Sequence, residues 1–462
     1  MRSPLSSIAI LGIIGLLTGC DSPLDPDAPL DVRVTPAVVS VGARDSVQLE
    51  AVVLNVAGGP NFGARFDWSS SDPQVAAVDP TGLVTGIQPG DVEIQAEHEG
   101  KVGRASLTVQ PRGYVSFAAS GFHTCALTFS SEAYCWGSNS SGKMGNGSSV
   151  GVRPVPEAVV GELRFESIMA GRHHTCALTS EGAAHCWGFN RDGQLGVGDT
   201  LARTVPTEVA GGLSFSDLSG GSWHTCGLTV EGRVYCWGQN ASSQLGLGEG
   251  LHGSAQLAPA TVATEVRFAS IDAGHDTTCG LTAEGVGYCW GRGALGAEGD
   301  SLDGDAWISY TPVEIPGVRL SEIRPGGYVR SLEDPPVASF ACGLGVGGAL
   351  YCWQSSDWAG VGVEPVVIAP GPFEAASLFG ERVCTLDGTG EVECRSPLAW
   401  SQPDLPAGEL RFVTLGVGLD HVCGAVENGL AYCWGLSEHG QLGDGVRVHL
   451  EPMPPVQVIE PE

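Results

Sequence analysis

Seven pairs of cysteines with one spacing constrain this chain more than any other feature. The two cysteines of a pair stand ten positions apart, as in HTCALTSEGAAHCWG (174–188), and the pairs use fourteen of the 15 cysteines. The pairs are Cys125 and Cys135, Cys176 and Cys186, Cys226 and Cys236, Cys279 and Cys289, Cys342 and Cys352, Cys384 and Cys394, and Cys423 and Cys433. One arrangement used seven times predicts seven copies of the same local structure.

A glycine inside each pair indicates what that local structure is. It falls six residues after the first cysteine in six units, at Gly182, Gly232, Gly285, Gly348, Gly390 and Gly429, and Ser131 replaces it in the first unit. A three-residue hairpin loop ends in a left-handed residue, which glycine favours. With Gly182 at that position, Thr179 pairs with Ala183, and Cys176 faces Cys186 in a non-hydrogen-bonded pair, where strands approach most closely. We predict seven cross-strand disulfides. Free buried thiols and a metal site are the open alternatives, although zinc repeats usually present Cys-x-x-Cys or mixed Cys and His sets.

The N-terminus predicts export. One arginine precedes an apolar run, Ile8 to Leu17, and then small residues, which is the layout of a secretory signal peptide over residues 1–19. The run is too short for a stable membrane span. Its end, Leu17-Thr18-Gly19-Cys20, resembles the bacterial lipobox, and that resemblance implies acylation of Cys20 as the first mature residue. Residues 20–29 would then be a tether. An ordinary signal peptide without lipidation is the alternative; in either case the chain reaches a compartment where disulfides persist.

Composition narrows the partners. The formal net charge is −29, charged residues are 16% of the chain, and 68 residues are glycine. Nucleic acid and anionic lipid surfaces attract clusters of Lys and Arg, so neither is an expected partner. The expected localisation is that of an exported bacterial lipoprotein in the cell envelope, held at the membrane through its lipid anchor only.

Residues 30–110 form a separate cysteine-free segment. Apolar residues alternate with polar ones in short runs, such as Val92, Ile94 and Ala96, and turn signals such as DPTG and QPGD separate the runs. This pattern predicts a small β-sandwich. The stretch DWSSSDPQVAAVDPTGLVTGIQPGDVEIQA (67–96) resembles the bacterial immunoglobulin-like group 2 domain. That resemblance implies a spacer, with adhesion as the alternative.

Residues 113–458 are a repeat. Successive first cysteines are 51, 50, 53, 63, 42 and 39 residues apart, a period that with short strands and many glycines predicts a propeller. The consensus AGxxHTCALTxEGxxYCWGxNxxGQLGxG resembles the repeat of the regulator of chromosome condensation family, which implies a seven-bladed β-propeller. The expected fold is therefore all-β, a seven-bladed β-propeller preceded by a small immunoglobulin-like β-sandwich. We expect the terminal PPVQVIE to add a strand to the first blade and close the ring.

Recurrent histidines and tryptophans are the first candidates for chemistry. The histidines His123, His174, His224 and His421 share one position in their units, and a tryptophan follows the second cysteine in most units. A residue repeated with the fold usually makes a repeated contact, so we predict hydrogen bonding for the histidines and packing between blades for the tryptophans. Metal or acid–base chemistry and a stacking platform are the respective alternatives. Trp223, Trp307, Trp358 and Trp400 lie off the repeat, and we predict partner contacts for Trp307, Trp358 and Trp400.

The sequence shows no catalytic, cofactor or metal motif. GQLGVGD (193–199) lacks the lysine and the strand–loop–helix context of a phosphate loop, so its glycines are best explained by turns. We therefore expect a non-enzymatic, monomeric, lipid-anchored envelope protein that binds a protein or glycan, without a cofactor. Its contact surface would be a propeller face or the irregular segments 297–340 and 395–408. The alternative is guanine-nucleotide exchange on a small GTPase, the activity implied by the family resemblance.

Overall fold

The computed structural model consists of two compact units, residues 1–109 and 110–462, which are described separately. The described residues are 29–43, 45–55, 60–61, 64–110, 113–293, 301–303, 306–328, 339–354, 364–379, 382–395 and 409–460. The predicted signal peptide (1–19), the predicted lipidation site Cys20 and nearly all of the predicted tether lie outside these ranges. Within them, the only helices are two three-residue 3-10 turns, η1 (Ser140–Gly142) and η2 (Glu249–Leu251). No helix in the described ranges has the length and apolar composition needed to cross a membrane.

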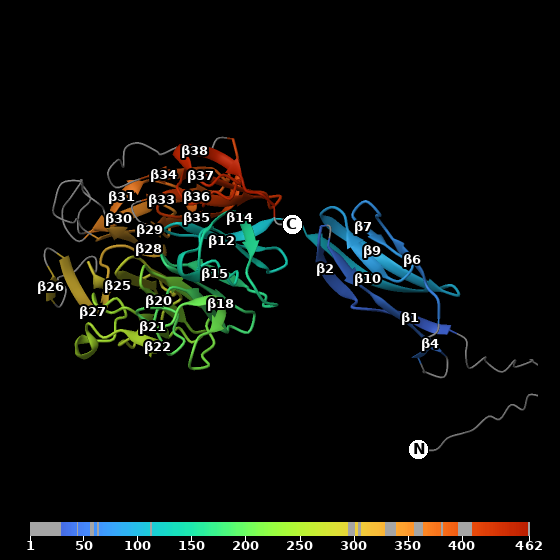
Figure 1. The fold of residues 1–462 in the computed structure, drawn as a ribbon, viewed down its shortest axis with the longest axis horizontal. Helices are drawn as coiled ribbons and strands as arrows, with labels where there is room; N and C mark the ends of the chain where they lie inside the picture. The colour runs from blue at the N-terminus through green and yellow to red at the C-terminus, as the bar shows by residue number, and fades with distance from the viewer. Residues whose placement is uncertain are drawn as a thin grey trace, which may run out of the picture. The chain divides into compact units, whose positions relative to one another are not determined.

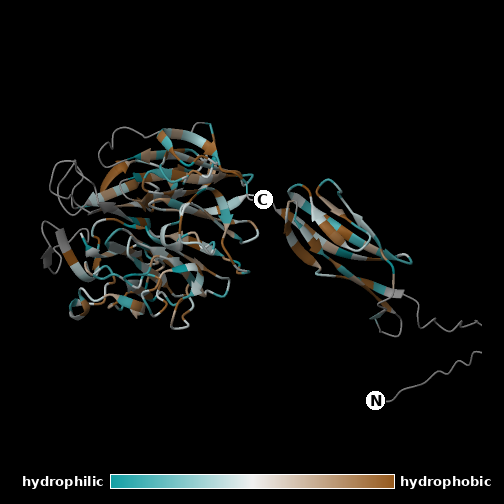
Figure 2. Ribbon diagram, in the orientation of Figure 1, coloured by the Kyte–Doolittle hydropathy of each residue, from teal (hydrophilic) through white to brown (hydrophobic). Residues whose placement is uncertain are grey.

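Unit 1 is a β-sandwich. Its strands are β1 (Pro29–Thr35), β2 (Val38–Gly42), β3 (Ser46–Gln48), β4 (Glu50–Asn55), β5 (Pro60–Asn61), β6 (Asp67–Ser70), β7 (Ala76–Val78), β8 (Leu83–Gly86), β9 (Gly90–His98) and β10 (Lys101–Gln110). They form the sheets β2-β10-β9-β6, β1-β4-β5 and β3-β8-β7. The predicted alternation is confirmed, because Val92, Ile94 and Ala96 of β9 are buried in one core while their neighbours are not. Apolar and polar residues alternate along these strands (Figure 2).

Unit 2 contains seven antiparallel sheets in chain order, which we call blades one to seven (Figure 1). Blade one consists of β11 (Tyr114–Ala119), β12 (His123–Thr128), β13 (Ala133–Ser138) and β14 (Val152–Ala158). Blade two consists of β15 (Ser167–Ala170), β16 (His174–Leu178), β17 (Ala184–Gly188) and β18 (Arg203–Glu208). Blade three consists of β19 (Asp217–Gly220), β20 (His224–Leu228), β21 (Val234–Gly238) and β22 (Gln256–Thr261). This confirms the predicted propeller.

The later blades are less regular. Blade four has β23 (Ser270–Ala273), β24 (Thr277–Leu281), β25 (Gly287–Arg292) and β27 (Ala306–Glu314), and β26 (Ser301–Asp303) pairs with β27 at the outer edge. Blade five has β28 (Leu320–Tyr328), β29 (Ser339–Gly345), β30 (Leu350–Gln354) and β31 (Val366–Ala369), and blade six has β32 (Phe373–Phe379), β33 (Arg382–Asp387) and β34 (Val392–Arg395). Blade seven has β35 (Phe412–Val417), β36 (His421–Val426), β37 (Ala431–Ser437) and β38 (His449–Gln457). Blade six thus has three strands among the described residues.

Each cysteine pair lies across a hairpin in the predicted register. The two cysteines of every pair are direct partners with Cα atoms 4.0–4.1 Å apart and are joined by a disulfide. The seven disulfides, in order from blade one to blade seven, join Cys125 to Cys135, Cys176 to Cys186, Cys226 to Cys236, Cys279 to Cys289, Cys342 to Cys352, Cys384 to Cys394 and Cys423 to Cys433. Thr179 N donates to Ala183 O at 3.1 Å, which closes the loop as expected. Gly182 has φ 77° and Ser131 has φ 62°, so the loop ends in the left-handed region even where glycine is replaced.

The ring closes through seven equivalent backbone hydrogen bonds. In each, the first residue of a blade, or the residue two positions before its first strand, donates to the left-handed residue of the preceding hairpin at 2.8–3.0 Å. The donors and acceptors are Phe165 to Ser131, Phe215 to Gly182, Phe268 to Gly232, Leu320 to Gly285, Phe373 to Gly348, Phe412 to Gly390 and, across the closure, Tyr114 to Gly429. The prediction that the terminal strand joins blade one was wrong, because β38 pairs with β37 and completes blade seven. Blade one has its own outer strand β14, so closure does not require β38. It is made by the bond from Tyr114 to Gly429, by the packing of β11 against β35 and by side-chain bonds between blades seven and one.

Candidate functional site

The two faces of the propeller carry different turns. The cysteine hairpins and the links between blades lie on one face, which we call the hairpin face. The turns that join the first two strands of a blade lie on the opposite face, which we call the inner-turn face. These inner turns contact one another between blades, as Arg172 N donates to Gly221 O at 3.2 Å and Leu419 N donates to Ser120 O at 3.1 Å. They therefore surround the propeller axis.

The repeated histidines bond across blade boundaries. Each donates from Nε2 to a threonine Oγ1 of the next blade at 2.7–2.9 Å, and the pairs are His123 with Thr175, His174 with Thr225, His224 with Thr278 and His421 with Thr124. Each threonine hydroxyl in turn donates to a main-chain carbonyl, for example Thr225 to Gln194 O at 2.8 Å. Because a hydroxyl has one proton, the histidine must be the donor in its bond, which makes it the Nε2–H tautomer.

These histidines are unsuited to acid–base or metal chemistry. All four are fully buried, and burial is the main cause that lowers their pKa, to about 3 for His174 and His421 and about 4 for His224. Nε2 is occupied by the threonine. The predicted structural role is confirmed, and the described residues contain no cluster of side chains that could hold a metal ion.

The histidine–threonine pairs connect blade seven to one, one to two, two to three and three to four. Blades four, five and six have Thr277, Phe340 and Arg382 at the histidine position, and blades five, six and seven have Ala341, Val383 and Val422 at the threonine position. The histidine–threonine pairs thus join four of the seven blade boundaries and are absent from the other three.

An ion cluster in the inner strands joins blades four, five and six and also contacts blade three. Arg324 of blade five donates to Asp272 of blade four at 2.9 Å and to Ala376 O of blade six at 2.9 Å. Ser219 of blade three donates to the same Asp272 at 2.9 Å. Burial, and then the negative charge of Asp272, raise the pKa of Asp217 to about 6. Because Arg324 is bonded on several sides by the propeller itself, this cluster stabilises the ring.

The repeated tryptophans lie between blades. Each is at most 2% exposed, and Trp187 Nε1 donates to Lys143 O of the preceding blade at 3.0 Å, the carbonyl that also accepts from Thr175. Trp136 and Trp237 make the corresponding bonds at 2.8 Å and 3.0 Å. The predicted packing role is confirmed, and a stacking platform for a ligand is excluded at these positions.

The residue before each histidine position differs from blade to blade. It is Phe122, His173, Trp223, Asp276 or Asp420 in blades one, two, three, four and seven. The His173 and Trp223 rings stack at 4.2 Å between blades two and three, and Phe189 meets Trp223 edge-on at 5.8 Å. The three rings are half-buried. Half-exposed aromatic rings beside polar groups are typical of binding surfaces.

Basic groups accompany these rings. Lys143 Nζ lies 6.0 Å from the centre of the Phe122 ring, and the Arg172 stem lies over Gly121, where an added Cβ would be 3.2 Å from Arg172 Cγ. We call Phe122, Lys143, Arg172, His173, Phe189 and Trp223 the inner-turn cluster. It draws on three blades and is the candidate site.

The predicted partner-binding tryptophans are not those of this cluster. Trp307 lies in β27, where its main chain pairs with Leu302 of β26, and its side chain lies outside the described residues. Trp358 and Trp400 lie outside the described residues altogether, as do most of 395–408 and parts of 297–340. Sequence reasoning noticed Trp223 but not its neighbours. Aligning the residue before the histidine across the units, and asking where it varies, would have found Phe122 and His173 but not the rest of the cluster.

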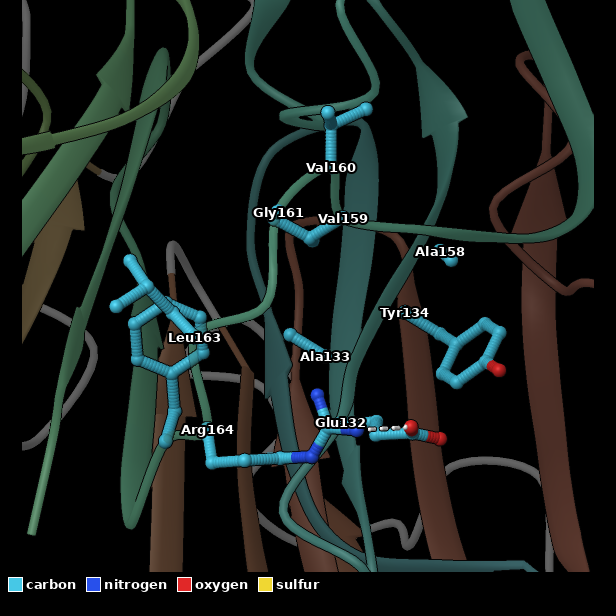
Figure 3. A pocket seen from close by; sticks show the side chains of 10 residues that line it. Glu132, Ala133, Tyr134, Ala158, Val159, Val160, Gly161, Leu163 and Arg164 are labelled. Atoms are coloured by element: carbon cyan, nitrogen blue, oxygen red, sulfur yellow. Dashed lines mark hydrogen bonds and ion pairs between the residues drawn. The ribbon is translucent and has the colours of Figure 1, made fainter.

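A shallow hollow on the hairpin face is a weaker candidate. It lies between the blade-one hairpin and the link to blade two, and its lining includes Ala133, Val160 and Leu163 (Figure 3). The Arg164–Glu132 ion pair, 2.7 Å long and largely exposed, crosses one end of it. Its polar groups are thus already paired, and nothing in it indicates a ligand.

Known families match both units. Sequence patterns of the regulator of chromosome condensation (RCC1) repeat match 114–143, 165–194, 215–244 and 412–441, and, in a second form, 130–178, 181–228 and 231–281. The bacterial Ig-like domain (group 2) matches residues 31–109. Both predicted resemblances are confirmed.

Individual relatives are similar over the propeller. The human E3 ubiquitin-protein ligase HERC2 is 25% identical over 339 residues, 72% of this chain but 5% of that protein. The ultraviolet-B receptor UVR8 of Arabidopsis thaliana is 39% identical over 88 residues, 19% of this chain and 20% of the receptor. The chain therefore spans a small part of these relatives. The crystal structure of human WBSCR16 matches with a TM-score of 0.59 at 20% identity, covering 71% of this chain and 94% of that one, which agrees with the fold.

Proposed function

We propose, for a chain that carries regulator of chromosome condensation repeats behind a bacterial Ig-like domain, a role as a binding protein of the bacterial cell envelope. Cys20 carries the lipid anchor, the immunoglobulin-like domain is a spacer, and the propeller binds a protein or glycan partner. The inner-turn cluster is the contact surface.

The single observation that supports the compartment is the geometry of the cysteine pairs. All fourteen cysteines are at most 3% exposed, and each pair occupies the closest cross-strand position of its hairpin. Disulfides persist in the periplasm and at cell surfaces, whereas thiols stay reduced in the cytosol. Seven disulfides of this kind therefore favour an exported protein.

The contrast between repeated and variable residues supports binding rather than catalysis. The repeated histidines, threonines and tryptophans bond to one another inside the ring, for example His174 to Thr225. The inner-turn cluster, in contrast, presents half-buried rings that vary between blades, as His173 and Trp223 do. The stability of the ring explains the repeated residues, whereas recognition of a partner better explains the variable residues of the inner-turn cluster.

The first experiment measures the intact mass of the protein from its native cells, with a thiol-alkylating reagent present throughout. We expect an acyl group on Cys20 and fourteen unalkylated cysteines. Fourteen alkylated thiols on an unprocessed chain would contradict the proposal. Nucleotide exchange on a small GTPase would then become the hypothesis to test.

The second experiment locates the contact surface. The chain without its lipid is incubated with solubilised envelope proteins and with an array of envelope glycans, and the bound molecules are quantified. We expect Trp223→Ala to weaken capture at least about tenfold, since aromatic anchors dominate such contacts. Val230→Ala is the matched control, because Val230 is 77% exposed on the hairpin face. Equal capture by both variants would place the contact elsewhere.

A further inference from the structure

Lysine is almost absent from this chain, and one of the few lysines is buried. The sequence contains two, Lys101 and Lys143. Lys101 is exposed in β10 of the immunoglobulin-like domain, whereas Lys143 is 1% exposed in the loop between β13 and β14. A buried lysine normally requires a partner, since its charge is costly to remove from water.

Lys143 is not required by the loop that contains it. The equivalent residue in blades two, three and seven is Gln194, Gln244 or Gln441. In each case the glutamine Oε1 accepts a bond from its own loop, at 3.1, 2.9 and 2.8 Å respectively. A lysine has no acceptor and cannot replace this bond. The substitution therefore gives up a loop contact and adds a buried positive charge.

The surroundings of Lys143 do not neutralise that charge. Within the described parts of the chain, its Nζ makes no hydrogen bond or ion pair, and its contact is with the Phe122 ring. Burial first, and then the positive charge of Arg172, lower the pKa of Lys143 to about 8, which still leaves it mostly protonated at about pH 7. His173 and His123 are also close enough for the Lys143 charge to lower their pKa, after burial.

We propose that Lys143, with the positive charge of Arg172 nearby, forms the base of an anion-binding pocket at the inner-turn face, which receives the carboxylate of an acidic side chain on a partner protein. This inference rests on the proposed function, because it assigns the chemistry of the group that the inner-turn cluster binds. A carboxylate in this position would supply the counter-charge that the described residues do not give Lys143, and charge-assisted hydrogen bonds are the strong ones.

The aromatic geometry favours a protein over an acidic glycan. A sugar usually stacks on an open aromatic face, but His173 stacks on Trp223 with an interplanar angle of 29°, and Phe189 meets its edge. The rings thus line one side of the basic groups. An acidic side chain can reach the basic groups beside these rings, whereas a sugar ring needs an open aromatic face on which to stack.

The scarcity of lysine permits a direct test. The full mature chain is labelled with 13C at the lysine ε carbon, so that its NMR spectrum contains two lysine signals, and it is titrated at about 0.15 M salt with hexaglutamate. Trigalacturonate and hexaglutamine are the comparison probes. We expect hexaglutamate to shift the Lys143 signal and to raise the pKa of Lys143 above about 8, with the Lys101 signal unchanged.

Two variants make the assignment specific. Lys143→Gln restores the residue of the sister blades, so it should fold, and it should weaken hexaglutamate binding at least about tenfold. Lys101→Gln, the matched control, should bind as the parent does. An unmoved Lys143 signal, or equal binding by Lys143→Gln, would overturn the pocket, and a preference for trigalacturonate would overturn the protein partner.

The outcomes also separate this inference from the proposed function. Envelope capture that depends on Trp223 but not on Lys143 would remove the carboxylate pocket and leave the binding function in place. Hexaglutamate binding at Lys143 without any captured envelope partner would support the pocket and contradict the proposed function.

Discussion

The histidine–threonine pairs predict how much one hydroxyl contributes to the ring. In the substitution Thr225→Val, a methyl group replaces the hydroxyl at nearly the same volume. The hydroxyl accepts from His174 Nε2 at 2.7 Å and donates to Gln194 O at 2.8 Å. Gln194 O keeps its bond from Trp237 Nε1 at 3.0 Å, so His174 is the group that loses its partner.

The magnitude follows from burial. His174 is fully buried, and leaving a buried donor without an acceptor costs about 1–3 kcal/mol. We expect Thr225→Val to destabilise the boundary between blades two and three by about 2 kcal/mol, which is about 30-fold in a local opening equilibrium. Thr207→Val on the outer strand β18 is the control. Its hydroxyl bonds only Val205 O, at 3.1 Å near solvent, so about 0.5 kcal/mol or less is expected.

Native-state hydrogen exchange followed by mass spectrometry is the appropriate assay. A ring of seven similar blades does not have to unfold in one step, so a single melting temperature would not isolate one boundary. With disulfides intact, amides of β16 and β20 should exchange about 30-fold faster in Thr225→Val than in the parent, and those of blade five should not change.

A double substitution tests the reasoning most strictly. His174→Phe with Thr225→Val reproduces Phe340 and Val383, which belong to one apolar core cluster between blades five and six. The double variant should be less destabilised than the sum of the two single variants, by about 1 kcal/mol or more. Additive effects, or a Thr225→Val effect no larger than the control's, would refute the proposed bond from His174.

Two further predictions concern acid and backbone strain. The pKa of His174 and of His421 is lowered to about 3 from 6.5, so their contribution to stability is complete above pH 6.5 and declines by about 1.4 kcal/mol per pH unit for each as the pH falls towards 3. In His174→Gln the denaturation midpoint should therefore fall less steeply as the pH is lowered. An unchanged dependence of the midpoint on pH would contradict this. Gly182→Ala should destabilise the blade-two hairpin by about 1–3 kcal/mol, measured by hydrogen exchange of β16 and β17, because Gly182 has φ 77° and an added Cβ would lie 2.6 Å from Phe215 O. Gly347→Ala, where an added Cβ meets no atom within 4 Å, is the control, and equal losses would show that the strain is not local.

Irregular parts of the propeller are where the sequence pattern and the structure differ. An aromatic residue stands eleven positions before the first cysteine in six units, and the insertion before Cys342 concealed Leu320, which donates the equivalent backbone bond in blade five. The terminal segment was assigned to the wrong blade, because strand periodicity does not distinguish one blade edge from another. The choice is made by the partner strand β37, which the sequence pattern cannot specify.

The sequence by itself determined the hairpins. The position of a left-handed residue and the register of two cysteines ten apart depend on a few adjacent residues, so Cys176 faces Cys186 wherever the hairpin lies. Because each repeat specifies one such hairpin locally, the number of repeats also determined the number of blades. Only the tertiary structure decided which residues meet between blades. The packing of neighbouring blades brings together positions about 50 residues apart, such as His174 and Thr225, and ring closure brings together the two ends of the unit, such as Thr124 and His421. His173 on Trp223 is a contact of that kind. Lys143 and Phe122 instead come together within blade one, from two different loops at the inner-turn face, and the candidate site combines both kinds of contact.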